Sequence, residues 1–203
     1  MKFGGTSVAS LPRWQNIREL VASRRAEGAR VLVVVSALSG ITDALKQLCR
    51  HADRAERNEA AKAIVQRHYE LLEHMQLALP GTLNERLGDL VRLADDSGSL
   101  GELAWQAQVQ AHGELMSSAL GAAFLSHSGV STQWLDAREC LSAVALPNQN
   151  ERTRLLSAMV EAKPDPALNT RLAALGEVFI TQGFIARESK GRTVLLGRGG
   201  SDT

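Results

Sequence analysis

Apolar residues recur at helical spacing along five stretches of the chain. Between residues 12 and 28, Pro12 suits a first helical turn, the apolar side chains that follow lie three or four positions apart, and Gly28 ends the pattern. The same spacing predicts helices over residues 41–48, 53–78, 83–94 and 101–126. The helix over residues 101–126 is expected to pack through a face of small and apolar side chains, which are Leu115, Ala119, Ala122 and Ala123.

Between these helical stretches the pattern changes to that of β-strands. Residues 30–37 (RVLVVVSA) are rich in β-branched side chains and apolar on both faces, which is typical of a central parallel strand covered by helices on each side. Further strands are expected at residues 133–135, 178–186 and 193–196, and at Lys2, where the strand is expected to begin before Met1.

Loop composition completes this outline of the fold. Residues 147–150 predict a loop, and Pro164 and Pro166 predict a second irregular segment. Strands that alternate with long helices predict an α/β fold, a three-layer sandwich around a mostly parallel central sheet.

Composition narrows the class of protein. With 203 residues, of which 44% are hydrophobic, the chain can bury roughly 70% of its unfolded surface, enough for one large domain or two small ones. Lys and Arg (23) balance Asp and Glu (22) and aromatic residues are only 4%, so nucleic-acid binding is not expected. The apolar runs are far shorter than the ~20 residues of a membrane span, and no leader pattern is present, so a cytoplasmic location without membrane contact is expected.

The two cysteines, Cys49 and Cys140, are 91 positions apart. This spacing fits neither a zinc site nor a secreted disulfide framework. We therefore expect buried or half-buried free thiols.

Three glycine-containing loops follow predicted strands. They span residues 4–7, 36–42 and 197–203, and each combines small residues with nitrogen or oxygen donors. In open α/β sheets, ligands bind outside the carboxyl ends of the strands. Glycine also lets consecutive backbone N–H groups converge on an anion, so phosphate or carboxylate is the expected ligand.

Glycine content alone does not identify the ligand. None of the loops is a Gly-x-x-x-x-Gly-Lys-Ser/Thr phosphate loop or a Gly-x-Gly-x-x-Gly dinucleotide motif. Taken singly, Gly4-Gly5 or Gly199-Gly200 is more often an ordinary turn.

Several collinear motifs together are more specific. The chain contains KFGGTSV at residues 2–8, SALSGIT at 36–42, HGELMS at 112–117, QWLD at 133–136, TQGFI at 181–185 and GRT at 191–193 followed by GRGGSD at 197–202. In this order they resemble the signatures of the aspartate kinases over the whole chain. The resemblance implies an amino-acid kinase fold and transfer of the ATP γ-phosphoryl group, accompanied by Mg²⁺, to the β-carboxylate of L-aspartate. This reaction is the first step toward lysine, threonine and methionine.

The resemblance also implies roles for individual residues. Lys2 would contact the transferred phosphoryl group, in a pocket lined by Gly4, Gly5 and Ser7. Asp202 would position the cationic groups around the reacting centre. The residues with an implied aspartate-binding role are Thr42, Glu114, Arg198 and Ser201.

These roles agree with the chemistry of phosphoryl transfer. The reaction needs alignment and charge neutralisation, and Lys2 supplies a positive charge. Arg198 can hold the α-carboxylate of aspartate with two parallel hydrogen bonds, and Glu114 can accept the α-ammonium. The β-carboxylate is already ionised near neutral pH, so no general base is required. For this reason we interpret His112 as a packed or capping side chain, and we interpret Trp134 and Asp136 as structural.

The resemblance implies that residues 1–203 form the amino-terminal, aspartate-binding part of a truncated kinase domain. The ATP-binding half and the regulatory domains are expected after Thr203, and this part alone is expected to have little or no kinase activity. The parent protein is expected to be a homo-oligomer. Some members of the family are fused to homoserine dehydrogenase or diaminopimelate decarboxylase, and residues 1–203 leave that question open.

Two alternatives remain at this point. One is a kinase of a related carboxylate such as glutamate or acetylglutamate, although the pairing of Glu114 with Arg198 favours a free amino acid. The other is a module that senses aspartate without phosphorylating it.

Overall fold

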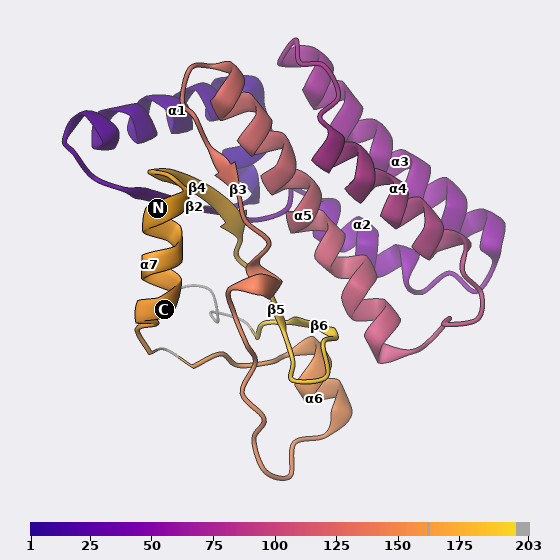
Figure 1. The fold of residues 1–203 in the computed structure, drawn as a ribbon. Helices are drawn as coiled ribbons and strands as arrows, with labels where there is room; N and C mark the ends of the chain where they lie inside the picture. The colour runs from indigo at the N-terminus through magenta and orange to yellow at the C-terminus, as the bar shows by residue number, and fades with distance from the viewer. Residues whose placement is uncertain (162, 198–203) are drawn as a thin grey trace.

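The computed structural model describes residues 1–161 and 163–197 of the chain. It contains a parallel sheet surrounded by helices (Figure 1). The strands are β1 (Lys2–Phe3), β2 (Val31–Val35), β3 (Gln133–Trp134), β4 (Val178–Gln182), β5 (Ile185–Arg187) and β6 (Thr193–Leu195). The α-helices are α1 (Leu11–Ala26), α2 (Ile41–Leu48), α3 (Arg54–His74), α4 (Gly81–Asp95), α5 (Leu103–His127), α6 (Glu151–Leu156) and α7 (Pro166–Leu175). Two 3₁₀ turns, η1 (Gly5–Val8) and η2 (Ala137–Glu139), complete the structure.

Four strands form one sheet in the order β1-β2-β4-β3, and every neighbouring pair is parallel. The predicted α/β class, the parallel sheet and the central position of β2 are therefore confirmed. Because the strands run in one direction, the loops after β1, β2 and β4 emerge at the same edge of the sheet.

One face of the sheet is closely packed against α1 and α5. Trp14 of α1 and Phe124 of α5 form an aromatic pair with ring centroids 6.1 Å apart. A Cβ placed on Gly121 of α5 would lie 2.1 Å from the Trp14 ring and 2.8 Å from Ile180 of β4. Only glycine lets the three elements approach so closely.

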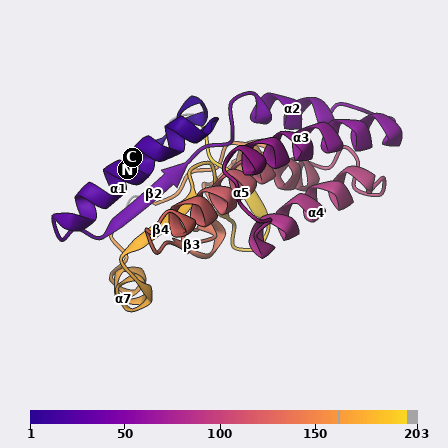
Figure 2. The same ribbon diagram turned by 90° about the horizontal axis from the view of Figure 1, so that it is seen from above.

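The other face of the sheet carries a thinner cover. Leu32 of β2 is 42% exposed, although the sequence pattern predicted helices over both faces. Leu168 and Leu172 of α7 line a cavity of about 280 Å³ together with Leu32, and α7 has no fully buried residue. Figure 2 shows α7 set apart from the other helices.

The predicted long helices are confirmed, and four of them, α2, α3, α4 and α5, form a group beside the sheet (Figures 1 and 2). Helix α5 lies at the centre of this group, in contact with α2, α4, the sheet and β6. Residues 109–122 are buried all round the helix, so the packing surface is wider than the predicted face of small residues. Within that predicted face, Ala123 is only half-buried.

The strand expected over residues 178–186 is two strands in different sheets. β4 ends at Gln182, and the chain bends at Gly183 and Phe184 before β5 pairs antiparallel with β6. The buried Gln182 side chain fixes the bend, since its Oε1 accepts from the Ala137 N–H at 2.7 Å and its Nε2 donates to Ser118 Oγ at 2.6 Å. The uniform apolar composition of this stretch conceals the change of partner strand.

Helices α6 and α7 were not predicted. The irregular segment expected at Pro164 and Pro166 ends as α7 begins, because Pro166 occupies the first turn and Asp165 caps it by accepting from the Leu168 N–H at 2.9 Å. The loop predicted at residues 147–150 is confirmed, and its last residue, Asn150, caps α6 by accepting from the Thr153 N–H at 2.8 Å.

Candidate functional site

Two of the three predicted ligand-binding loops lie against each other at the carboxyl edge of the sheet. Ser36, which follows β2, donates its N–H to the Phe3 carbonyl at 3.0 Å. A Cβ on Gly5 would lie 2.7 Å from the Ala37 carbonyl oxygen, so a larger residue would push the loops apart. Around Gly4, no described atom outside its chain neighbours lies within 4 Å of an added Cβ. The backbone is therefore open to a ligand there.

Glu114 approaches this pair of loops from α5. Its carboxylate is buried (4% exposed), and Oε1 accepts from the Ala37 N–H at 3.2 Å. Gly113 makes the approach possible, since a Cβ there would lie 2.8 Å from the Ala37 Cβ. The structure thus brings Gly5, Ala37 and Glu114 together from segments far apart in the sequence.

The second carboxylate oxygen of Glu114 gives the site its electrostatic character. Oε2 is buried and has no hydrogen-bond partner among the described residues. Burial raises the pKa of Glu114 from 4.5 to about 7, and the hydrogen bond from Ala37 offsets only part of this effect. A cationic ligand would satisfy Oε2 and restore the charged form of the carboxylate.

Thr42 adjoins the same loop on its far side. It is half-buried in the first turn of α2. Gly40 has a φ of 81°, which lets the loop turn into the helix, and Arg67 of α3 holds the loop by donating to the Ser39 carbonyl at 2.9 Å. The loop that leads to Thr42 is therefore held in place by Arg67.

Lys2 and Ser7 flank the first loop. Lys2 is exposed in β1, where its Cα pairs with that of Val34, and Ser7 is half-buried in η1. The predicted phosphate-binding roles of Lys2, Gly4, Gly5 and Ser7 stay predictions.

The third loop lies almost wholly outside the described residues. Gly197 donates its N–H to the Ala158 carbonyl at 3.1 Å. Arg198, Ser201 and Asp202, for which the resemblance implies substrate-binding and catalytic roles, lie outside the described part of the chain.

The sequence did not predict one contact of the site, nor one buried hydroxyl on the same helix as Glu114. The Ala37 N–H holds a residue 77 positions away, and no sequence pattern indicates such a contact. Ser117 is fully buried, and its Oγ has no partner in residues 1–161 and 163–197. Its spacing of three residues from Glu114 places it on the same helical face. This spacing could have been recognised from the sequence.

The residues interpreted as structural have structural partners. Trp134 donates from Nε1 to Ser118 Oγ at 2.9 Å, and Asp136 accepts from the Arg138 N–H at 3.0 Å. His112 is buried with its Nδ1 2.8 Å from the Gln108 carbonyl. Cys49 and Cys140 are half-buried free thiols, as predicted.

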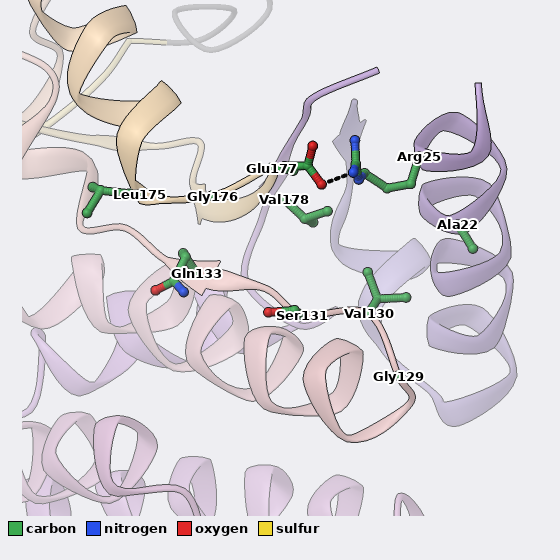
Figure 3. Close-up of a pocket in the computed structure, with 10 residues that line it drawn as sticks. All are labelled: Ala22, Arg25, Gly129, Val130, Ser131, Gln133, Leu175, Gly176, Glu177 and Val178. Carbon is green, nitrogen blue, oxygen red and sulfur yellow. Dashed lines mark hydrogen bonds and ion pairs between the residues drawn. The ribbon is translucent and has the colours of Figure 1, made fainter. Parts of the chain in front are cut away.

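A separate pocket of about 460 Å³ lies at the opposite, amino-terminal edge of the sheet (Figure 3). Figure 3 shows Arg25 of α1 paired with Glu177, which lies just before β4. Ligands of open α/β sheets bind at the other edge, and the two charges already neutralise each other. We assign this pocket no role.

The described residues contain no cluster of three or more His, Cys, Asp or Glu side chains that could hold a metal ion. None of the helices in the described part of the chain is long and apolar enough to cross a membrane.

Comparison with known proteins is consistent across sequence and structure. The model of the amino acid kinase family matches residues 1–203. Lysine-sensitive aspartokinase 3 of Escherichia coli (strain K12) is 36% identical over 99% of this chain and 43% of its own length. Bifunctional aspartokinase/homoserine dehydrogenase 2 of the same strain is 31% identical over 99% of the chain and 24% of its own length.

Solved structures agree with the sequence matches. The crystal structure of E. coli aspartokinase III in complex with aspartate and ADP superposes with a TM-score of 0.75, at 36% identity, over 99% of this chain and 44% of that one. Aspartate kinase of Clostridium acetobutylicum gives a TM-score of 0.72 at 18% identity, covering 99% of this chain and 42% of that one, which shows a shared fold. The chain spans less than half the length of these relatives.

Proposed function

We propose, since the chain belongs to the amino acid kinase family, that residues 1–203 are the aspartate-binding part of an aspartate kinase. The protein would transfer the γ-phosphoryl group of ATP to the β-carboxylate of L-aspartate. A β-carboxylate oxygen forms the new bond to phosphorus, and the bond to the β,γ-bridging oxygen breaks, giving 4-phospho-L-aspartate and ADP.

The observation that carries this proposal is the buried Glu114 carboxylate, one oxygen of which has no described partner. A buried carboxylate with one oxygen lacking a described partner is costly unless a cation pairs with it. The α-ammonium of a free amino acid supplies that cation and would lower the pKa of Glu114, so that binding at pH 6 to 7 releases a proton. Glu114 lies beside the Ala37 loop, and the Ala37 loop contacts the Gly5 loop. This arrangement supports a substrate at the edge of the sheet where the two loops meet.

The remaining roles follow the chemistry of the reacting groups. Lys2 places a positive charge at the exposed end of β1, where it would stabilise charge on the transferred phosphoryl oxygens. Gly4 leaves room for those oxygens near the backbone. Arg198 would hold the α-carboxylate of aspartate, with Thr42 and Ser201 as hydroxyl partners and Asp202 orienting the cationic groups.

ATP and Mg²⁺ belong to this proposal. Mg²⁺ usually binds through one or two carboxylates together with substrate phosphates, so it would enter with the nucleotide. The homo-oligomeric state and the cytoplasmic location stay predictions.

A substrate panel tests the proposal. The natural protein that contains residues 1–203 is assayed for ADP formation with aspartate, glutamate and N-acetylglutamate. We expect turnover with aspartate and none with N-acetylglutamate, because N-acetylation removes the cation that Glu114 requires. Turnover of N-acetylglutamate without aspartate turnover would overturn the assignment.

A second assay of the same natural protein distinguishes an aspartate kinase from an aspartate sensor. Calorimetric binding of aspartate without any ADP formation in the presence of ATP and Mg²⁺ would favour the aspartate-sensing alternative. In the enzyme, Arg198→Ala should mainly raise the KM for aspartate, since the bidentate grip on the α-carboxylate acts in the ground state as well.

A further inference from the structure

The side chain of Gln182 bonds to three segments at the point where the chain leaves the main sheet. Gln182 is the last residue of β4 and is 1% exposed. Its Oε1 accepts from the Ala137 N–H at 2.7 Å, and its Nε2 donates to the Leu135 carbonyl at 3.1 Å and to Ser118 Oγ at 2.6 Å. Because a backbone N–H can only donate and a carbonyl can only accept, these partners fix the orientation of the amide.

Ser118 joins this network to the helix that carries Glu114. It is fully buried on α5, about one turn after Glu114. Its hydroxyl donates to the Leu115 carbonyl at 3.1 Å and accepts from Gln182 Nε2 and, at 2.9 Å, from Trp134 Nε1. A hydroxyl has one donor and two acceptor positions, so all positions of the Ser118 hydroxyl are used. The network therefore fixes α5, close to Glu114, against the end of β4.

The residue after Gln182 joins the network to the loop that follows β2. Gly183 donates its N–H to the Val35 carbonyl at 3.2 Å. Val35 is the last residue of β2 and lies two positions before Ala37, whose N–H holds the Glu114 carboxylate. The chain at Gln182 and Gly183 is therefore bonded both to α5 and to the segment that meets Glu114.

The next residue contacts the strand that leads into the third loop. The Phe184 carbonyl accepts from the Leu196 N–H at 2.8 Å. Leu196 lies just beyond β6 and two positions before Arg198 in the sequence. Because Phe184 is two positions after Gln182, the amide network determines where the start of the third loop lies relative to α5.

We propose that Gln182 is a positioning residue that sets the spacing between Glu114 and the third loop. The inference rests on the proposed function, in which Glu114 binds the α-ammonium of aspartate and Arg198 binds its α-carboxylate. These two groups are attached to the same carbon atom, so their partners must be held at one fixed separation. Gln182 touches neither aspartate nor ATP in this arrangement, and it acts through the segments that do.

A buried amide suits this role better than an apolar side chain. Apolar burial is non-directional, whereas a fully hydrogen-bonded network in the core rigidifies the structure and specifies one arrangement. Misplacing a bound group by about 1 Å can cost ~10²-fold in rate. Loss of the Gln182 hydrogen bonds should therefore weaken aspartate binding even in a protein that remains folded.

Gln182→Met tests the proposal in the natural protein that contains residues 1–203. Methionine keeps the unbranched shape of glutamine and removes all three hydrogen bonds. In the folded variant, the Kd for aspartate measured by calorimetry should rise at least ~10-fold. A purely structural role would lower the folded fraction, and with it the apparent kcat, but would leave this Kd unchanged.

Trp105→Phe is the matched control. Trp105 lies near the amino-terminal end of α5, is 2% exposed, and donates from Nε1 to the Leu93 carbonyl at 3.0 Å. Its substitution also removes a buried hydrogen bond from this helix, but none that leads to the third loop. It should lower the thermal midpoint while the Kd for aspartate stays within ~2-fold of the wild-type value.

The outcomes separate this inference from the proposed function. An unchanged Kd for aspartate in folded Gln182→Met, or an equal rise in Trp105→Phe, would overturn the positioning role alone. A wild-type protein that binds no aspartate would contradict the proposed function itself. If Gln182→Met does not fold, Gln182→Glu takes its place, because its carboxylate keeps the acceptor for the Ala137 N–H and lacks the donor for the Leu135 carbonyl. The same rise in Kd is expected, and an unchanged Kd would again overturn the role.

Discussion

Replacing Glu114 with glutamine keeps the shape of the side chain and removes its charge. Burial raises the pKa of Glu114 from 4.5 to about 7 in the folded protein. Between these two pH values the folded state holds a proton that the unfolded state has lost, so the stability from this group is present below pH 4.5 and is lost as the pH rises to about 7. At about 1.4 kcal/mol for each pKa unit, the loss is about 3 kcal/mol, and the glutamine variant does not undergo it.

The assay compares the two proteins at two pH values. Urea unfolding can be followed by tryptophan fluorescence, because Trp14, Trp105 and Trp134 all lie within this chain. From pH 5 to pH 8, where most of the effect is expressed, the stability of the wild-type protein should fall by about 2–3 kcal/mol relative to Glu114→Gln. Titrations common to both proteins cancel in this difference.

Aspartate should reverse the effect in the wild-type protein. With the α-ammonium beside it, Glu114 ionises, and calorimetry in two buffers at pH 6 should detect proton release in the wild-type protein and none in Glu114→Gln. A stability difference that does not change between pH 5 and pH 8 would refute the description of Glu114 as a buried, under-compensated carboxylate.

Three further predictions use single substitutions. Gly121→Ala places a Cβ 2.1 Å from an indole carbon of α1 and should destabilise the protein by about 1–3 kcal/mol or more in urea unfolding; Gly88→Ala, within α4 and in ordinary contact distance only, should be neutral or stabilising by up to about 1 kcal/mol. Gly5→Ala should lower the thermal midpoint because its Cβ meets the carbonyl of the neighbouring loop at 2.7 Å, whereas Gly4→Ala, which meets no described atom, should leave it within about a degree. Lys2→Ala should lower kcat by at least ~10²-fold in a steady-state assay, and an unchanged kcat would exclude its phosphate role.

The long helices and the central strand were predictable because buried positions recur as apolar residues with a regular spacing in the sequence. Each predicted helix from α1 to α5 carries apolar residues on the side that packs. The break between β4 and β5 at Gly183 has no such pattern, since both strands are apolar and differ in the strand they pair with. Pro166 was misleading because proline both interrupts and begins helices.

The candidate site was predictable only in part. The meeting of the first two loops followed from the rule that parallel strands end at one edge. Glu114 was identified through its motif, because a carboxylate in mid-helix is ordinarily solvated. Its bond to the Ala37 N–H depends on a tertiary contact between segments 77 positions apart, and no local pattern encodes such a contact.

The most direct test of the aspartate kinase assignment is the identity of the product. The natural protein is incubated with ATP, Mg²⁺, aspartate and hydroxylamine, which converts an acyl phosphate into a hydroxamate, and the product is identified by mass spectrometry. The account predicts the β-hydroxamate of aspartate in a one-to-one ratio with ADP. ADP formed without this hydroxamate, or aspartate bound without any ADP, would contradict it.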